Sequence, residues 1–164
     1  MRASTRILIV FYSLEGSTKL VAHTLAEELG AELLEIKPEK EIRSTGFMRY
    51  FWGGRQVMMN IMPPLRPFSV NIEEFGTVIV GTPVWAFDLS PPIRAFLSRT
   101  AIEGKKVAVF CTHEGDPAKT LENMERALKN NVIISRKGFL NVAKNKEEAI
   151  GQGREWAEEL KNAV

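Results

Sequence analysis

The chain is poor in the residues that build disulfides, metal centres and membrane spans. Its 164 residues include one cysteine, Cys111, so no internal disulfide can form. A lone thiol is typical of a reducing compartment, and we expect a cytoplasmic protein. Two histidines without clustered carboxylates predict no metal site. No apolar run approaches the roughly 20 residues of a membrane helix, and the N-terminal stretch lacks the apolar region of a secretory signal.

Net charge is also scarce. The chain carries 22 basic and 20 acidic residues, for a net charge of +2, which is too small an excess to indicate nucleic-acid binding. The length fits one domain, and no repeat or linker-like stretch divides it. We therefore expect residues 1–164 to form a single domain.

Short apolar runs alternate with amphipathic stretches along most of the chain. The continuous runs predict strands that are buried on both faces. The predicted strands are 7–12, 31–36, 77–81, 107–111 and part of 132–140, and the last of them is interrupted by the polar residues 135–138. Helices are predicted to begin at Ser90-Pro91, at Asp116-Pro117 and near Asn145. A further helix is predicted to end at Gly30. This alternation predicts an α/β fold, a three-layer doubly wound five-stranded parallel sheet with strand order 2-1-3-4-5.

Residues 38–70 depart from this alternation. The stretch Phe47–Met62 is rich in aromatic residues and methionines. It is consistent with a second crossover helix that packs on the sheet. It is also consistent with an adaptable surface for a partner, including a homodimer through residues 47–62.

Three segments follow strands whose carboxyl ends should lie together. Ligands of such sheets bind where the strand order reverses, here between the first and third strands. Ser13–Thr18 joins the first strand to a helix, and its hydroxyls, its glycine and the helix start predict a phosphate cradle. The segment has neither a Walker spacing nor G-x-G-x-x-G.

The other two segments suit a flat cofactor. Trp85, within Thr82–Asp88, could stack on a planar ring, although burial in the core is the commoner role of a tryptophan. Cys111–Asp116 offers a glycine and polar groups that could border the polar edge of a ring. Its His113 could act as a cation there or serve only to shape the loop.

Together these segments resemble the flavodoxin family. Ser13–Thr18 is similar to its phosphate loop, roughly S/T-x-T-G-x-T, and Gly81–Trp85 is similar to its second flavin loop. The resemblance extends from Ile7 to the last helix and implies a flavodoxin-like FMN-binding domain of the short-chain branch. The FMN-binding residues that it implies are Ser13, Leu14, Glu15, Gly16, Ser17, Thr18, Thr82, Pro83, Val84, Trp85, Ala86, Phe87, Thr112, His113, Glu114 and Gly115.

Three features depart from the family pattern. Glu15 stands where a hydroxyl is usual, and we expect it to contribute backbone N–H and to turn its carboxylate outward. Ala86 stands where many members have glycine, so we expect a peptide flip there to be costlier, because φ > 0 is disfavoured outside glycine. The small positive net charge differs from the acidic composition typical of the family.

The resemblance leaves three functions open. The first is an FMN-binding electron-transfer protein without catalytic side chains of its own, which exchanges electrons with a redox partner protein. The alternative is an FMN-dependent NAD(P)H:quinone or flavin reductase, which needs open space above the ring. The third is a binding module of the same fold that has lost its flavin.

Overall fold

The computed structural model describes residues 4–41, 55 and 61–164. Most of the apolar stretch 47–62 lies outside the described residues, so its two interpretations and the homodimer stay predictions. In the described part of the chain, no helix is long and apolar enough to cross a membrane.

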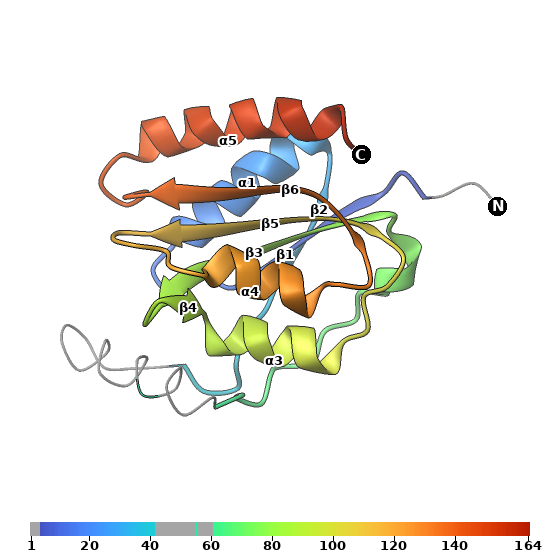
Figure 1. Ribbon diagram of the computed structural model, residues 1–164, viewed down its shortest axis with the longest axis horizontal. Helices are drawn as coiled ribbons and strands as arrows, with labels where there is room; N and C mark the ends of the chain where they lie inside the picture. Colours follow the sequence, from blue (N-terminus) through green and yellow to red (C-terminus); the bar gives the residue numbers. More distant parts are fainter. Residues whose placement is uncertain (1–3, 42–54, 56–60) are drawn as a thin grey trace.

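A mostly parallel sheet forms the middle of the molecule (Figure 1). Its parallel path is β2-β1-β3-β5-β6, and these strands are β1 (Ile7–Phe11), β2 (Glu32–Glu35), β3 (Thr77–Trp85), β5 (Lys106–His113) and β6 (Val132–Leu140). The predicted doubly wound fold and strand order are confirmed. The short strand β4 (Asp88–Leu89), antiparallel to the end of β3, was not predicted.

Two pairs of helices cover the two faces of the sheet. Helices α1 (Ser17–Leu29) and α5 (Lys146–Lys161) lie on one face, and α3 (Pro91–Arg99) and α4 (Thr120–Ala127) lie on the other (Figure 1). A 3₁₀ turn, η1 (Ile72–Glu74), precedes β3. Alternation along the strands supplies both cores: in β1, Leu8 and Val10 pack toward α3 and α4, whereas Ile9 packs toward α1 and α5.

Three of the predicted helix boundaries are confirmed and one is wrong. Gly30 ends α1 with φ 62°, Ser90 precedes the prolines that begin α3, and Asn145 precedes α5. The predicted start at Asp116-Pro117 is wrong, because the Asp116 carboxylate accepts from the Ala118 N–H at 2.8 Å and forms a local turn instead. Helix α4 therefore begins at Thr120. The predicted interruption of the last strand by the polar residues 135–138 is also absent, since β6 pairs regularly there and its one register shift lies between Ile133 and Ser135.

The carboxyl ends of the central strands lie level with one another. Phe11 pairs with Gly81, and Gly81 pairs with Phe110. A Cβ added at Gly81 would lie 2.1 Å from the Phe110 ring, so only glycine allows this approach. The Phe110 ring in turn contacts Phe139 and Trp156 edge-on. This aromatic cluster forms a rigid floor beneath the sheet edge where the loops meet.

Candidate functional site

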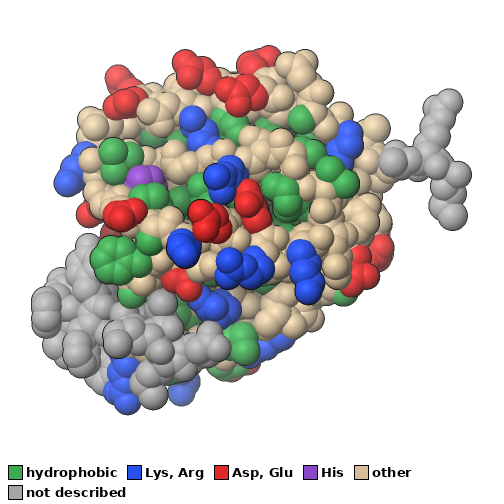
Figure 2. Space-filling model, in the orientation of Figure 1, with side chains coloured by type: hydrophobic (Ala, Val, Ile, Leu, Met, Phe, Trp, Pro, Cys, Tyr) green, Lys and Arg blue, Asp and Glu red, His purple; other side chains and the backbone are tan. Residues whose placement is uncertain are grey.

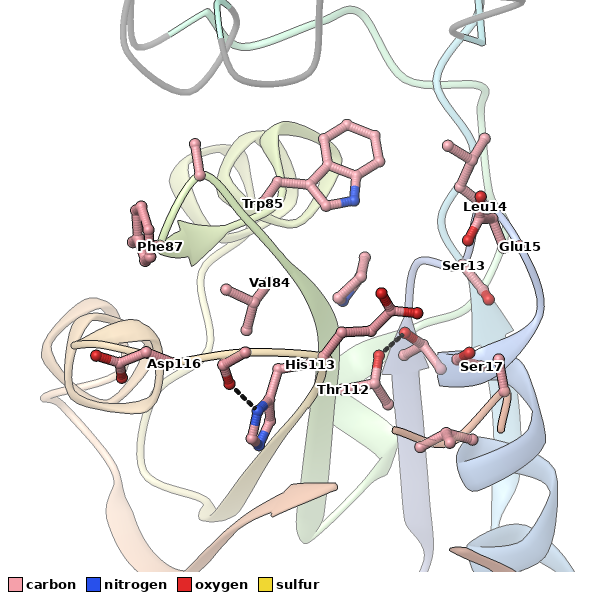
Figure 3. Close-up of a pocket in the computed structure, with 17 residues that line it drawn as sticks. Ser13, Leu14, Glu15, Ser17, Val84, Trp85, Phe87, Thr112, His113 and Asp116 are labelled. Atoms are coloured by element: carbon pink, nitrogen blue, oxygen red, sulfur yellow. Dashed lines mark hydrogen bonds between the residues drawn. The ribbon is translucent and has the colours of Figure 1, made fainter. Parts of the chain in front are cut away.

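A cavity of about 300 Å³ opens at the carboxyl edge of the sheet (Figure 3). It lies at the ends of β1, β3 and β5, where the predicted segments come together. All the predicted site residues line it except Gly16 and Thr82. The cavity is also lined by Asp116, Val142 and Ala143, which were not among the predicted site residues.

The segment between β1 and α1 presents open backbone donors. Gly16 has φ 103°, which turns the chain into the helix. The Ser13 hydroxyl accepts from the N–H groups of Gly16 and Lys19, at 3.1 and 3.2 Å. The first N–H groups of a helix have no intrahelical partner, and the described residues supply no acceptor for those of Ser17 and Thr18. These two amides remain available to an anion.

A buried pair of hydroxyls joins the first and third segments. Thr18 Oγ1 and Thr112 Oγ1 lie 2.8 Å apart, and both side chains are almost fully buried. The bond ties the first turn of α1 to the end of β5. The two walls of the cavity are therefore fixed relative to each other.

The second segment is a hairpin rather than the predicted loop. Strand β3 continues to Trp85, turns at Ala86-Phe87 and returns as β4, with Trp85 opposite Asp88. Ala86 and Phe87 have φ of 47° and 65°, the pattern of a type I′ turn without its usual glycine. Residues held in this region cost roughly 1–3 kcal/mol each. Ala86 therefore adopts a positive φ that is disfavoured outside glycine, and the expected higher cost of a peptide flip there stays a prediction.

Asp88 anchors the strained turn. One carboxylate oxygen accepts from Leu89 N at 2.8 Å and from Asn123 Nδ2 at 3.0 Å. The other accepts from Arg94 at 2.6 Å, and both partners of this ion pair are mostly shielded from solvent. The hairpin is thereby fastened to both α3 and α4.

Thr82 belongs to the same anchor and does not reach the cavity. Its side chain is fully buried, and its Oγ1 lies 2.9 Å from Ser90 Oγ and accepts from Ser90 N at 3.0 Å. Strand alternation accounts for this difference, because successive side chains point to opposite faces of a sheet. Pro83 therefore lines the cavity, and Thr82 does not. The sequence did not reveal that the strand continues this far.

Trp85 forms one wall of the cavity, opposite Leu14 (Figure 3). Its ring meets Tyr12 edge-on, with centroids 5.6 Å apart. Tyr12 is buried, and its hydroxyl donates to Glu41 at 2.9 Å. Burial, with the Glu41 charge adding to it, raises the pKa of Tyr12, so the phenol stays neutral and holds the indole in place.

Two contacts restrict the rotation of the His113 ring. Its Nδ1 lies 2.7 Å from the Gly115 carbonyl oxygen, which requires the proton on Nδ1. The ring packs over Gly138, where an added Cβ would lie 3.0 Å from Nε2. Below it, burial raises the pKa of the Cys111 thiol to about 12, so this cysteine is a neutral core residue.

Among the described residues that line the cavity there are acidic side chains but no lysine or arginine. Glu15, Glu114 and Asp116 line it and are exposed. Elsewhere both signs are interspersed, as on the face over α3 and α4, while carboxylates gather over α5 (Figure 2). Within the described residues, no group of three or more histidine, cysteine or carboxylate side chains could hold a metal ion.

Val142 and Ala143 could have been anticipated. They follow β6, which lies beside β5 and ends at the same edge. Small apolar residues carry no chemical signal of their own in a sequence. Only the rule that parallel strands end together would have included them.

The family model described as flavodoxin matches residues 6–160. The chain belongs to the flavodoxin family. No curated protein matches it. Among solved structures, the chain is similar to a flavoprotein from Lactobacillus acidophilus in complex with FMN, at 20% identity and TM-score 0.72, with 88% of this chain and 98% of that one covered. It is also similar to oxidised flavodoxin 2 from Bacillus cereus, at 16% identity and TM-score 0.63, over 98% and 100%.

Proposed function

We propose that this flavodoxin-family chain binds FMN in the cavity and transfers electrons between redox partners. The observation that carries the proposal is the pair of open amides at Ser17 and Thr18, which faces a cavity walled by Trp85. Neutral amides and hydroxyls suit a phosphate, and the indole suits a planar ring. The similar Lactobacillus flavoprotein was solved with FMN.

The side chains divide the work of holding the cofactor. The amides of Ser17 and Thr18 would bind the phosphate, and the Ser13 hydroxyl keeps the loop in shape. Trp85 and Leu14 would exclude water from the two sides of the ring system. Bound FMN supplies one- and two-electron redox chemistry, which needs no acid or base from the protein.

The local charge indicates the kind of redox partner. Although the chain is net basic, the described residues that line the cavity include the exposed carboxylates of Glu114 and Asp116. A partner with a basic face would be attracted to these carboxylates, and the attraction would weaken with salt. The described lining residues offer no lysine or arginine to the pyrophosphate of NADH or NADPH.

Anaerobic stopped-flow spectroscopy tests the proposal. We expect the FMN-loaded protein to be reduced negligibly by NADH or NADPH, with free FMN as the control, and to exchange electrons readily with a ferredoxin reductase. Rapid reduction by a nicotinamide nucleotide, with turnover of a quinone, would instead establish the reductase alternative. Failure of the purified chain to bind FMN would contradict both functions.

A further inference from the structure

The contact between α1 and β5 changes from apolar to polar at the cavity. The buried row of α1 begins at Thr18 and continues with Val21. Alternate residues of β5 face the same core, which contains Ala108 and Phe110, and Thr112 comes next in this alternation. Thr18 and Thr112 both line the cavity. The two hydroxyls therefore lie where each row of buried residues reaches it.

The two hydroxyls carry one more proton than their contacts use. Thr18 Oγ1 and Thr112 Oγ1 lie 2.8 Å apart, and the two residues are only 1% and 5% exposed (Figure 3). One proton forms the bond between the two oxygens. In the part of the chain that the structure describes, neither hydroxyl makes another hydrogen bond, so the second proton has no acceptor there. A buried donor of this kind costs free energy unless a ligand supplies the acceptor.

The place of Thr18 in the helix indicates which acceptor the second proton meets. Thr18 is the second residue of α1, and its backbone N–H is one of the two open amides to which the phosphate is assigned. If Thr112 donates to Thr18 Oγ1, the Thr18 hydroxyl keeps its own proton for an anion at the helix start. A hydroxyl that accepts a hydrogen bond is also polarised into a stronger donor.

We propose that Thr112 is a positioning residue for the phosphate of FMN: it donates to Thr18, and Thr18 donates to a phosphate oxygen. The inference rests on the proposed placement of the phosphate at the amides of Ser17 and Thr18. It assigns Thr112 to the phosphate end of the cofactor, whereas the sequence placed its segment at the edge of the flavin ring. Two valines of the same shape would suit the apolar rows equally well, so the hydroxyls serve the ligand rather than the core.

Isothermal titration of the apoprotein with FMN and riboflavin tests the proposal. We expect Thr18→Val to weaken FMN binding about tenfold and Thr112→Val roughly three- to fivefold. Riboflavin has no phosphate, and its affinity should change less than about twofold. Thr112→Ser keeps the hydroxyl and should stay within about twofold of the unsubstituted protein. In a Thr18→Val background, Thr112→Val should weaken FMN binding no further, because Thr112 acts through Thr18.

Thermal unfolding of the same apoproteins separates this role from a purely structural one. The double variant removes both hydroxyls and leaves no buried donor unpaired at this contact, so its Tm should not fall below that of the unsubstituted protein. Thr24→Val is the matched control. Thr24 is a buried residue of α1 that does not line the cavity, and its hydroxyl donates to the Leu20 carbonyl at 2.9 Å. This substitution should leave both affinities unchanged.

Three results would overturn the proposal. Equal losses for FMN and riboflavin in Thr112→Val would assign Thr112 to the ribityl or ring part of the flavin. Additive losses in the double variant would show that Thr112 acts independently of Thr18. An unchanged FMN affinity in Thr112→Val, with a lower Tm in the double variant, would make the pair a structural contact only. A separate result, FMN binding no more tightly than riboflavin to the unsubstituted protein, would instead contradict the placement of the phosphate in the proposed function.

Discussion

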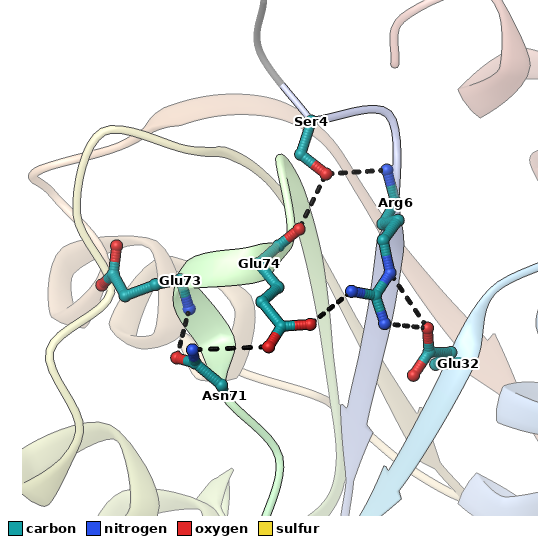
Figure 4. A network of polar contacts seen from close by, with 6 residues as sticks. All are labelled: Ser4, Arg6, Glu32, Asn71, Glu73 and Glu74. Atoms are coloured by element: carbon teal, nitrogen blue, oxygen red, sulfur yellow. Dashed lines mark hydrogen bonds and ion pairs between the residues drawn. The ribbon is translucent and has the colours of Figure 1, made fainter. Parts of the chain in front are cut away.

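The two edges of the sheet use their polar groups in opposite ways. At the amino edge these groups satisfy one another: Arg6 contacts both Glu32 and Glu74, and the Ser4 hydroxyl donates to the Glu74 carbonyl (Figure 4). Asn71 caps η1 by accepting from Glu73 N at 3.2 Å. The edge is closed by these contacts.

At the carboxyl edge, donors and strained backbone remain directed toward a cavity. The amides of Ser17 and Thr18 lack acceptors among the described residues, and the Ala86-Phe87 turn has positive φ at both positions. The exposed fraction of the Phe87 side chain is 67%, large for an aromatic residue. The comparison shows that the carboxyl edge is distinguished by unpaired backbone donors among the described residues and by strained backbone conformations, not by its amino-acid composition.

The largest expected effect tests the floor beneath the open edge. Gly81→Ala would drive a Cβ into the Phe110 ring, and we expect a loss of about 3 kcal/mol in the free energy of unfolding. This corresponds to a fall in Tm of roughly 6–12 °C, measured by calorimetry. Gly151→Ala, where an added Cβ meets nothing within 4 Å, is the control and should not lower Tm. An unchanged Tm in Gly81→Ala would contradict the rigid floor.

The next effect compares one serine at each edge. Ser13→Ala removes the acceptor of two N–H groups in the phosphate loop, and we expect FMN affinity to fall about tenfold. Riboflavin affinity should change less than about twofold, because riboflavin has no phosphate. Ser4→Ala, which removes the hydroxyl bond to Glu74 at the amino edge, should leave both affinities unchanged. Equal losses for FMN and riboflavin would show that Ser13 does not act through the phosphate.

A third effect, similar in size to the second, depends on pH. Burial raises the pKa of Cys111 from 9.0 to about 12, so only the unfolded chain loses this proton between these values and stability falls as pH rises. At pH 10 the loss is about 1.4 kcal/mol relative to neutral pH. In urea titrations, the free energy of unfolding of Cys111→Ala should fall by about 1.4 kcal/mol less than that of the unsubstituted protein between neutral pH and pH 10. An identical slope in both proteins would mean that the thiol ionises in the folded state.

Much of this architecture could be predicted from the sequence. Continuous apolar runs such as Ile7–Tyr12 identify strands buried on both faces, and Gly30 and Ser90 locate helix ends. The segment Ser13–Thr18 could be placed at the cavity because small hydroxyl residues and a glycine precede a helix, and its binding of phosphate stays a proposal. These patterns involve residues close together in the chain, so they can be interpreted without knowledge of the tertiary structure.

The remainder depends on contacts between distant segments. The hairpin turn at Ala86-Phe87 contains no glycine, so the sequence did not indicate positive φ there. Contacts of Asp88 with α3 and α4 hold the turn in this conformation instead. Thr82 faces Ser90 rather than the cavity because β3 extends beyond its apolar run. A second cavity, which shares Glu15, Ser17, Val142 and Ala143 with the first, lies where α1 meets the turn before α5, more than a hundred residues away in the chain.

The smallest expected effect lies at the closed edge. Arg6→Met removes both ion pairs and the cation–π contact with Phe75, whose ring centroid lies 4.6 Å from Arg6 Cζ, and it keeps an unbranched aliphatic side chain. The side chains of Arg6, Glu32 and Glu74 are about half exposed, so we expect Tm to fall by at most about 2 °C, and less in about 0.5 M salt. FMN affinity, measured by quenching of flavin fluorescence, should not change. A weakened affinity would mean that the two edges are coupled through β1, and that closing one of them helps to shape the other.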